Sequence, residues 1–144
     1  MNIANVLTAT AKRNPRKAAI VLENENISYE RLDRTTTSLA RWFARQGLKP
    51  GDRVAIHWPN SIETVELFLA SFKAGMIAVP INVRVKTPEV AYILEHSKAA
   101  IYFAHPRFVG GGERGEEHLR RVELHTYNSG DCSRRRPAGI ACGE

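Results

Sequence analysis

Cysteine is scarce in this chain of 144 residues. Cys132 and Cys142 are the only two, and both lie near the C-terminal end of the sequence. Neither belongs to a Cys-x-x-Cys pair or to a Cys/His pattern with the spacing of zinc ligands. We therefore expect two free thiols and no metal site.

A long apolar run is also missing. The longest stretch, Val65 to Ile81, is interrupted by Glu66, Lys73, Gly75 and Pro80, and a membrane span tolerates such residues poorly. The first residues of the chain lack a basic region followed by an apolar core, which argues against a secretory signal. We expect a cytoplasmic protein without a membrane span.

Aromatic residues are absent from the basic clusters. The formal net charge is +6, with basic clusters only near the N-terminus (Lys12 to Lys17) and near the C-terminus (Arg134 to Arg136). No aromatic side chain interleaves with them to stack on bases, and no helix-turn-helix or zinc-finger spacing is present. A solvated surface explains these charges, and we expect no nucleic-acid partner.

The sequence does contain an alternation of helical and strand patterns. Apolar residues at three- and four-residue steps predict helices, and short β-branched or apolar runs bounded by turn residues predict strands. Predicted helices cover Ile3 to Lys12, Tyr29 to Phe43, a segment from Asn60 to Gly75 and one that opens at Thr87; predicted strands cover Ala18 to Glu23, Ile27 to Tyr29, Arg53 to Trp58, Met76 to Pro80 and Ala99 to Ala104. Asn60, with Glu63 three positions later, matches a capping box at the start of its helix.

This alternation sets the predicted fold class. Strands that are apolar runs rather than strict in-out patterns are typical of a parallel sheet that is buried on both faces. We therefore predict an α/β fold with a partial, mainly parallel sheet, covering helices and right-handed crossovers. The predicted organisation is a partial N-terminal α/β segment over residues 1–105, followed by an atypical, irregular or disordered tail over residues 106–144.

The predicted tail differs in composition from the rest of the chain. Seven of the ten glycines and both cysteines lie beyond His105, and lysine is absent there. Apart from a helical pattern at Glu116 to Leu124, this segment has too few apolar residues to offset the entropy of ordering, and we expect disorder beyond Asn128. We hypothesise that the sequence departs from its ancestral reading near Arg107, through a frameshift or a broken gene.

One motif in the tail has the spacing of a nucleotide-binding loop. Gly110, Gly112 and Gly115 fit the pattern G-x-G-x-x-G, in which glycines let backbone amides approach a pyrophosphate. Three glutamates in and beside the pattern would place negative charge where phosphate binds. A nucleotide site here is the least favoured of our functional hypotheses.

No catalytic residue is assigned from the sequence. His57, His96 and His105 share no motif with a nucleophile or a carboxylate partner, and no serine lies in a Gly-x-Ser-x-Gly elbow. We interpret these histidines as structural or surface residues. Ser28 and Ser61 are interpreted as helix caps or turn residues.

Five short segments, taken in order, resemble the N-terminal portion of AMP-forming acyl-CoA synthetases, which belong to the adenylate-forming, AMP-dependent synthetases and ligases. The segments are Ile27 to Tyr29 (ISY), Gly47 to Ile56 (GLKPGDRVAI), Pro59 to Ser61 (PNS), Lys73 to Gly75 (KAG) and Val79 to Arg84 (VPINVR). The helical pattern from Glu89 to Ala99 extends the resemblance, which then covers roughly two thirds of the chain.

The resemblance implies an enzyme of fatty acid metabolism. Such an enzyme joins a carboxylic acid to ATP, with magnesium, as an acyl adenylate, and then transfers the acyl group to coenzyme A (CoA). The family's phosphate-binding loop, ribose-binding aspartate and C-terminal lysine have no counterpart in this sequence. We therefore expect a truncated relative that is inactive alone.

One cofactor-binding residue carries over from the resemblance. Arg84 matches a place where some family members offer an arginine to the CoA nucleotide, and Lys86 nearby is a weaker candidate. A solvated loop cation is the alternative interpretation of Arg84. An alternative for the whole chain is a non-catalytic α/β interaction module that pairs through an open sheet edge or self-associates through exposed core.

Overall fold

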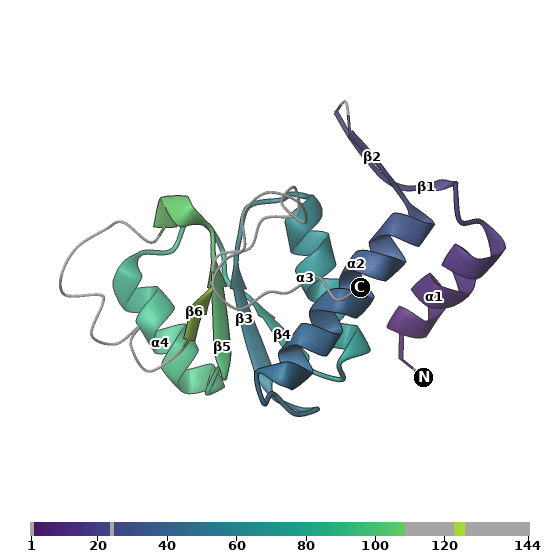
Figure 1. Ribbon diagram of the computed structural model, residues 1–144. Coiled ribbons are helices and arrows are strands. Elements are labelled where there is room, and N and C mark those ends of the chain that lie inside the picture. The colour runs from purple at the N-terminus through teal and green to yellow at the C-terminus, as the bar shows by residue number, and fades with distance from the viewer. Residues whose placement is uncertain (1, 24, 109–122, 126–144) are drawn as a thin grey trace.

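The computed structural model describes residues 2–23, 25–108 and 123–125 (Figure 1). The elements are α1 (Ala4–Arg13), β1 (Ala18–Leu22), β2 (Glu25–Ser28), α2 (Tyr29–Arg45), β3 (Arg53–His57), α3 (Ile62–Lys73), β4 (Ile77–Pro80), α4 (Thr87–Ser97), β5 (Ile101–Ala104), a 3₁₀ turn (Pro106–Phe108) and β6 (Glu123–His125). Among the described residues, no helix is long and apolar enough to span a bilayer.

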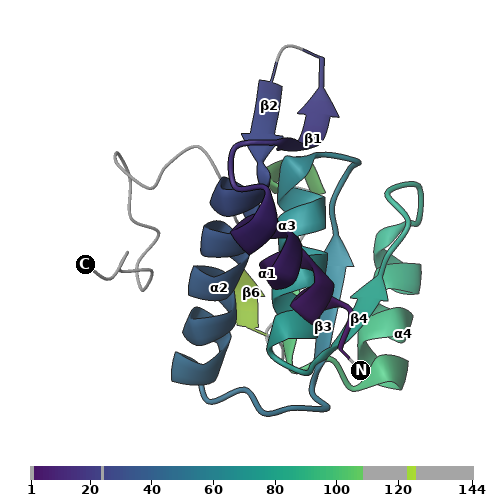
Figure 2. The same ribbon diagram turned by 90° about the vertical axis from the view of Figure 1, so that its right-hand side faces the viewer.

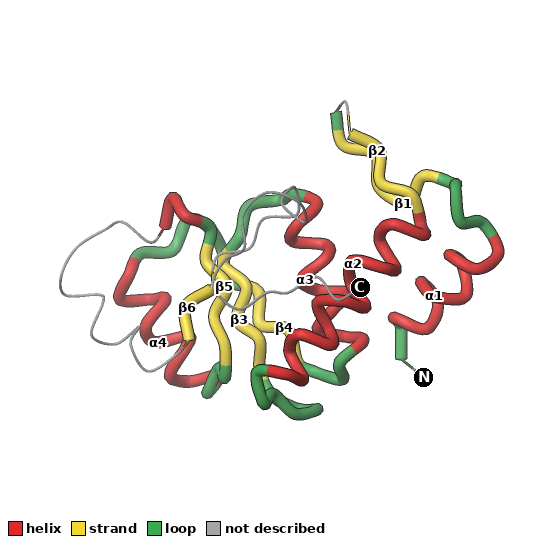
Figure 3. The backbone as a smooth tube through the Cα atoms, viewed as in Figure 1, coloured by secondary structure: helices red, strands yellow, loops and turns green. Residues whose placement is uncertain are grey.

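The strands form a parallel sheet, which confirms the predicted α/β fold. Its order is β4-β3-β5-β6, so the chain crosses from one side of β3 to the other between β4 and β5. In the register, Ile56 of β3 lies opposite Pro80 of β4 and Phe103 of β5. β1 and β2 form a separate antiparallel hairpin that projects from the helices away from the sheet (Figure 3).

Helices cover both faces of this sheet. Val54, Ile56, Ile101 and Phe103 pack with α2 and α3 in the main core, whereas alternate residues of the same strands pack with α4. Side chains of a strand point alternately to opposite faces, so apolar runs fit a sheet that is buried on both sides. In Figure 2, α1, α2 and α3 lie side by side, and α4 lies across the sheet from them.

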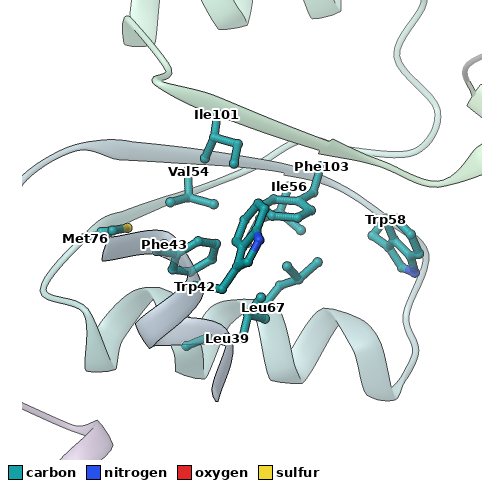
Figure 4. Packing of buried hydrophobic residues seen from close by; sticks show 11 residues of the cluster. Leu39, Trp42, Phe43, Val54, Ile56, Trp58, Leu67, Met76, Ile101 and Phe103 are labelled. Carbon is teal, nitrogen blue, oxygen red and sulfur yellow. The ribbon is translucent and has the colours of Figure 1, made fainter. Parts of the chain in front are cut away.

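The main core is centred on an aromatic group. The Phe43 ring lies 5.9 Å from the Phe103 ring and the Trp42 ring lies 6.1 Å from it, both edge to face, which is a favourable arrangement for aromatic quadrupoles. Leu67 of α3 and Met76 complete the contact between helices and sheet (Figure 4). The longest of the described helices, α2, thus supplies the aromatic side chains that pack against the sheet.

Two predicted helix starts are tested by the capping geometry. Ser28 Oγ accepts the Arg31 backbone N–H at 3.2 Å, which confirms Ser28 as the cap of α2. The capping box of Asn60 and Glu63 is wrong, because the cap of α3 is Ser61, whose Oγ accepts the Thr64 N–H at 3.4 Å. Asn and Ser both suit an N-cap, and the backbone conformation decides which of the two neighbours takes that position.

The prediction for the tail is partly corrected. Glu123–His125 form β6, a parallel neighbour of β5 with Leu124 opposite Tyr102, so the predicted helix over Glu116 to Leu124 is wrong at its last two positions. Pairing with the edge of β5 overrides the helical spacing at these positions. The glycine motif, both cysteines and the segment beyond Asn128 lie outside the described residues.

Candidate functional site

The loops that follow three parallel strands meet at one edge of the sheet. Strands β3, β4 and β5 end at His57, Pro80 and Ala104, and carboxyl ends of parallel strands share one edge. In open α/β sheets, ligands bind in the crevice outside these ends. The candidate site is therefore built from the loops around residues 58–61, 81–86 and 105–108.

A cavity of about 500 Å³ opens beside the ends of β3 and β4. Its floor is apolar, with Ile56, Trp58 and Ile81 all nearly fully buried. Asn60, Thr64 and Asn82 supply the polar groups of its lining. This size, together with an apolar floor and a few polar groups, is typical of small-molecule sites.

Arg84 lies at this edge, in the loop after β4. Its backbone N–H donates to Asn82 Oδ1 at 2.9 Å, which closes a turn of the loop, and the residue is exposed. Lys86 lies two residues further on, where its backbone N–H donates to Glu89 Oε2 at 2.8 Å at the start of α4. Arg84 is thus free in solvent on a loop whose backbone is fixed.

The predicted structural histidine His57 lies behind this edge, on the face of the sheet that α4 covers. It is 3% exposed, and its Nδ1 lies 2.8 Å from the hydroxyl of Tyr102. Phe108 stacks on its ring at 4.3 Å with an interplanar angle of 7°. His105 lies edge-on to Trp58 at 5.0 Å, and His96 stacks on Tyr92 at 5.5 Å.

Burial governs the protonation of this pair. Loss of solvent lowers the pKa of His57, the Asn82 backbone opposes that shift and the Arg107 guanidinium adds to it. Burial also raises the pKa of Tyr102 to about 12. Both side chains are therefore neutral near pH 7, and the pair is a hydrogen bond rather than an ion pair.

The contact between His57 and Tyr102 was missed by the sequence reasoning. His57 and Tyr102 are 45 positions apart, and no local spacing connects them. A usable signal was present, because each residue interrupts an otherwise apolar strand with a polar group that needs a partner. In the register His57 lies opposite Ala104, and Tyr102 is its diagonal neighbour on the same face of the sheet.

The chain matches the family model described as AMP-binding enzyme over residues 7–136. A long-chain-fatty-acid–CoA ligase of Mycobacterium tuberculosis, FadD13, is 37% identical over 107 residues, which are 72% of this chain and 21% of that protein. A 3-oxocholest-4-en-26-oate–CoA ligase of Rhodococcus rhodochrous is 32% identical over 97 residues, which are 67% of this chain and 18% of that protein.

Solved structures show the same fold. The N-terminal domain of FACL13 from Mycobacterium tuberculosis superposes with a TM-score of 0.77 at 28% identity, covering 88% of this chain and 34% of that one. The chain spans about a fifth of the length of the curated relatives named above. The family match also runs past His105, into the segment that composition set apart. The chain belongs to the family of AMP-binding enzymes.

Proposed function

We propose that this chain forms the amino-terminal part of an acid–thiol ligase and has no ligase activity by itself. In the proposed reaction, a carboxylate oxygen of the acid attacks the α-phosphorus of ATP, and pyrophosphate leaves. The thiol of CoA then attacks the acyl carbonyl, and AMP leaves. The printed name of the Mycobacterium tuberculosis relative gives a long-chain fatty acid and CoA for that protein, and we propose a carboxylic acid and CoA for this one.

The described residues provide a scaffold for this reaction rather than its phosphate chemistry. Within the described ranges, no group of three or more His, Cys, Asp or Glu side chains is placed to hold a metal ion. Magnesium bound to ATP needs carboxylate or similar oxygen ligands. We propose that ATP and magnesium are bound by residues outside this part of the chain, and we propose a cytoplasmic location for the whole.

The observation that carries the proposal is the position of Arg84. It is an exposed guanidinium on a fixed loop at the carboxyl edge of the sheet, and a guanidinium binds phosphate through several parallel donors. The same loop, through Asn82 and Val83, lines the cavity beside β3 and β4. We propose that Arg84 contacts a phosphate of the CoA nucleotide.

A chimeric ligase tests this role. Residues of this chain replace the matched 107-residue region of the Mycobacterium tuberculosis ligase, with and without Arg84→Ala. Loss of a charge-assisted contact worth roughly 1.5–3 kcal/mol should raise KM for CoA about tenfold to a hundredfold. ATP–pyrophosphate exchange should be unchanged, because adenylation precedes CoA binding.

Arg41→Ala is the matched control, since Arg41 is exposed on α2, away from this edge. An unchanged KM for CoA in the Arg84→Ala chimera would exclude the contact. Exchange activity in the isolated chain would exclude the proposed inactivity. The two readouts are independent, so either part of the proposal can fail without the other.

An interaction module remains the alternative, and the exposed outer strand β4 favours it. Ile77 N–H donates to Asp52 O, and Ile81 N–H donates to Ile56 O, both toward β3. Alternation along the strand then turns only the Ala78 N–H outward, because Pro80 has no N–H. Strand addition at β4 would gain few hydrogen bonds, so we propose that any association there uses apolar side chains such as Ile77, which is 53% exposed.

A further inference from the structure

The His57 imidazole has one of its two nitrogens unsatisfied inside the protein. Nδ1 pairs with the Tyr102 hydroxyl at 2.8 Å, whereas Nε2 has no hydrogen-bond partner, the one such buried side-chain atom among the described residues. A backbone interaction with Asn82 favours the protonated ring, but it does not give Nε2 a hydrogen bond of normal geometry. Nε2 therefore depends on its apolar cover.

Protonation would make this arrangement unstable. The neutral ring satisfies Tyr102 when Nδ1 accepts the phenolic O–H and Nε2 carries the proton. A second proton on Nδ1 would face that O–H, and the phenol would have to turn its hydrogen away. The charged ring would then hold an Nε2–H without solvent and with only the Asn82 backbone near it, and an unsatisfied charged donor costs more than a neutral one.

Of the charged and titratable groups around the ring, Arg107 adds to this effect. The Arg107 guanidinium opposes a positive charge on His57, and it lies 4.6 Å from the centre of the Phe108 ring. An aromatic face attracts a cation and could stabilise the imidazolium, but the Arg107 guanidinium already lies over the Phe108 ring. His105 lies 6.0 Å from Phe108, and the Tyr102 phenol stays neutral in the whole range of interest.

Of the side chains that cover His57, Phe108 is held in place by the fewest backbone hydrogen bonds. Tyr102 is held in β5, which pairs with β3 along its length. Phe108 belongs to a single 3₁₀ turn, where its N–H donates to His105 O at 2.8 Å and the Arg107 N–H donates to His105 Nδ1 at 3.3 Å. Movement of this turn therefore exposes a protonated His57 to water at the lowest free-energy cost.

We propose that His57 is an acid-operated latch for the turn Pro106–Phe108. Protonation of the imidazole displaces Phe108 from the stack, admits water to Nε2 and releases Arg107 from the Phe108 ring. As a consequence, the charged His57 and the released Arg107 guanidinium are both exposed at the carboxyl edge of the sheet. The latch follows from the fold alone and does not depend on the proposed ligase function.

Nuclear magnetic resonance of the full chain between pH 8 and pH 5 tests the latch. The midpoint of the His57 imidazole signals should lie below the usual value of 6.5 for histidine. The Phe108 amide should shift with the same midpoint. Its opening, from hydrogen exchange divided by the intrinsic rate, should rise up to about tenfold per pH unit below 6.5, as one-proton linkage requires.

Three variants decide between this latch and other titrations. His57→Leu keeps an apolar stack without a titrating group and should abolish the Phe108 transition. His96→Leu, on the surface of α4, should leave it unchanged. His105→Gln should also leave the midpoint unchanged, because the latch does not require the bond from Arg107 to His105.

A Phe108 transition that persists in His57→Leu, or that disappears in His105→Gln, would overturn the proposal. If His57→Leu does not fold, the titration midpoints of His57 and Phe108 in the unmodified chain are compared instead. Different midpoints for His57 and Phe108 would exclude the latch, and equal midpoints that also survive His105→Gln would support it.

Discussion

Lys73 Nζ of α3 lies 2.6 Å from Asp33 Oδ1 of α2. The same ammonium donates to Thr37 Oγ1 at 2.7 Å and to the Asp33 carbonyl oxygen at 2.9 Å, and Thr8 of α1 donates to Asp33 Oδ1 at 2.7 Å. The Lys73 side chain is only 10% exposed. One lysine of the KAG segment therefore links the three N-terminal helices through a partly buried polar network.

Replacing Lys73 by methionine should destabilise the fold. The change keeps the aliphatic stem and removes three donors from partly buried acceptors, and hydrogen bonds to charged groups contribute about 1.5–3 kcal/mol. We expect the free energy of unfolding in urea to fall by about 2 kcal/mol. Lys49→Met is the control, because Lys49 is exposed, and an equal loss in both variants would contradict the role of the network.

The same network predicts an acid-sensitive stability. Burial opposes ionisation of Asp33, but hydrogen bonds from Lys73 and Thr8 outweigh it and hold the pKa of Asp33 below 3.8. A folded pKa below the unfolded one stabilises the protein above pH 3.8, and this contribution is lost as pH falls through the folded value. Unfolding followed from pH 6 to pH 2 should show this loss, and Asp33→Asn should remove that component.

Gly75 and Gly47 form a matched pair for a backbone test. Both have positive φ, +72° for Gly75 and +81° for Gly47, but a Cβ at Gly75 would lie 3.3 Å from Pro50 Cβ, whereas one at Gly47 would meet nothing within 4 Å. A left-handed non-glycine residue costs roughly 1–2 kcal/mol. In urea or thermal unfolding, both alanine variants should lose about that much free energy of unfolding, and Gly75→Ala should lose more. Equal losses would show that Pro50 moves aside without destabilising the fold.

Exposed apolar side chains of the hairpin predict self-association. Val21 is 69% exposed and Leu22 is 43% exposed on β1, which lies on a hairpin that projects from the body (Figure 1). Two-stranded hairpins are marginal without further packing. Light scattering should show concentration-dependent association that Val21→Ser with Leu22→Ser reduces; Tyr92→Ser, 65% exposed on α4, should not change it.

The sequence was informative where the physics is local. Amphipathic spacing located α2, which runs from Tyr29 to Arg45. The apolar runs gave β3, β4 and β5 and a parallel sheet. The sequence offered both Asn60 and Ser61 as caps, and only the structure decided that Ser61 caps α3.

The candidate site was predicted only in part. Arg84 was chosen because it matches a family position, and the structure places it on the exposed edge loop; its contact with CoA stays a prediction. The cavity beside β3 and β4 is lined by residues between positions 56 and 83, and no motif spacing predicts it. The tail boundary at His105 and the frameshift also stay predictions.

By itself, the sequence determined the element types, the α/β class and the family, because periodicity and the order of short motifs are properties of the chain alone. Only the tertiary structure decided which distant polar groups meet: Lys73 with Asp33, and His57 with Tyr102 under Phe108. The physical reason is that a buried polar atom must find a partner. That partner is fixed by strand register and helix packing, which bring together residues 40 and 45 positions apart.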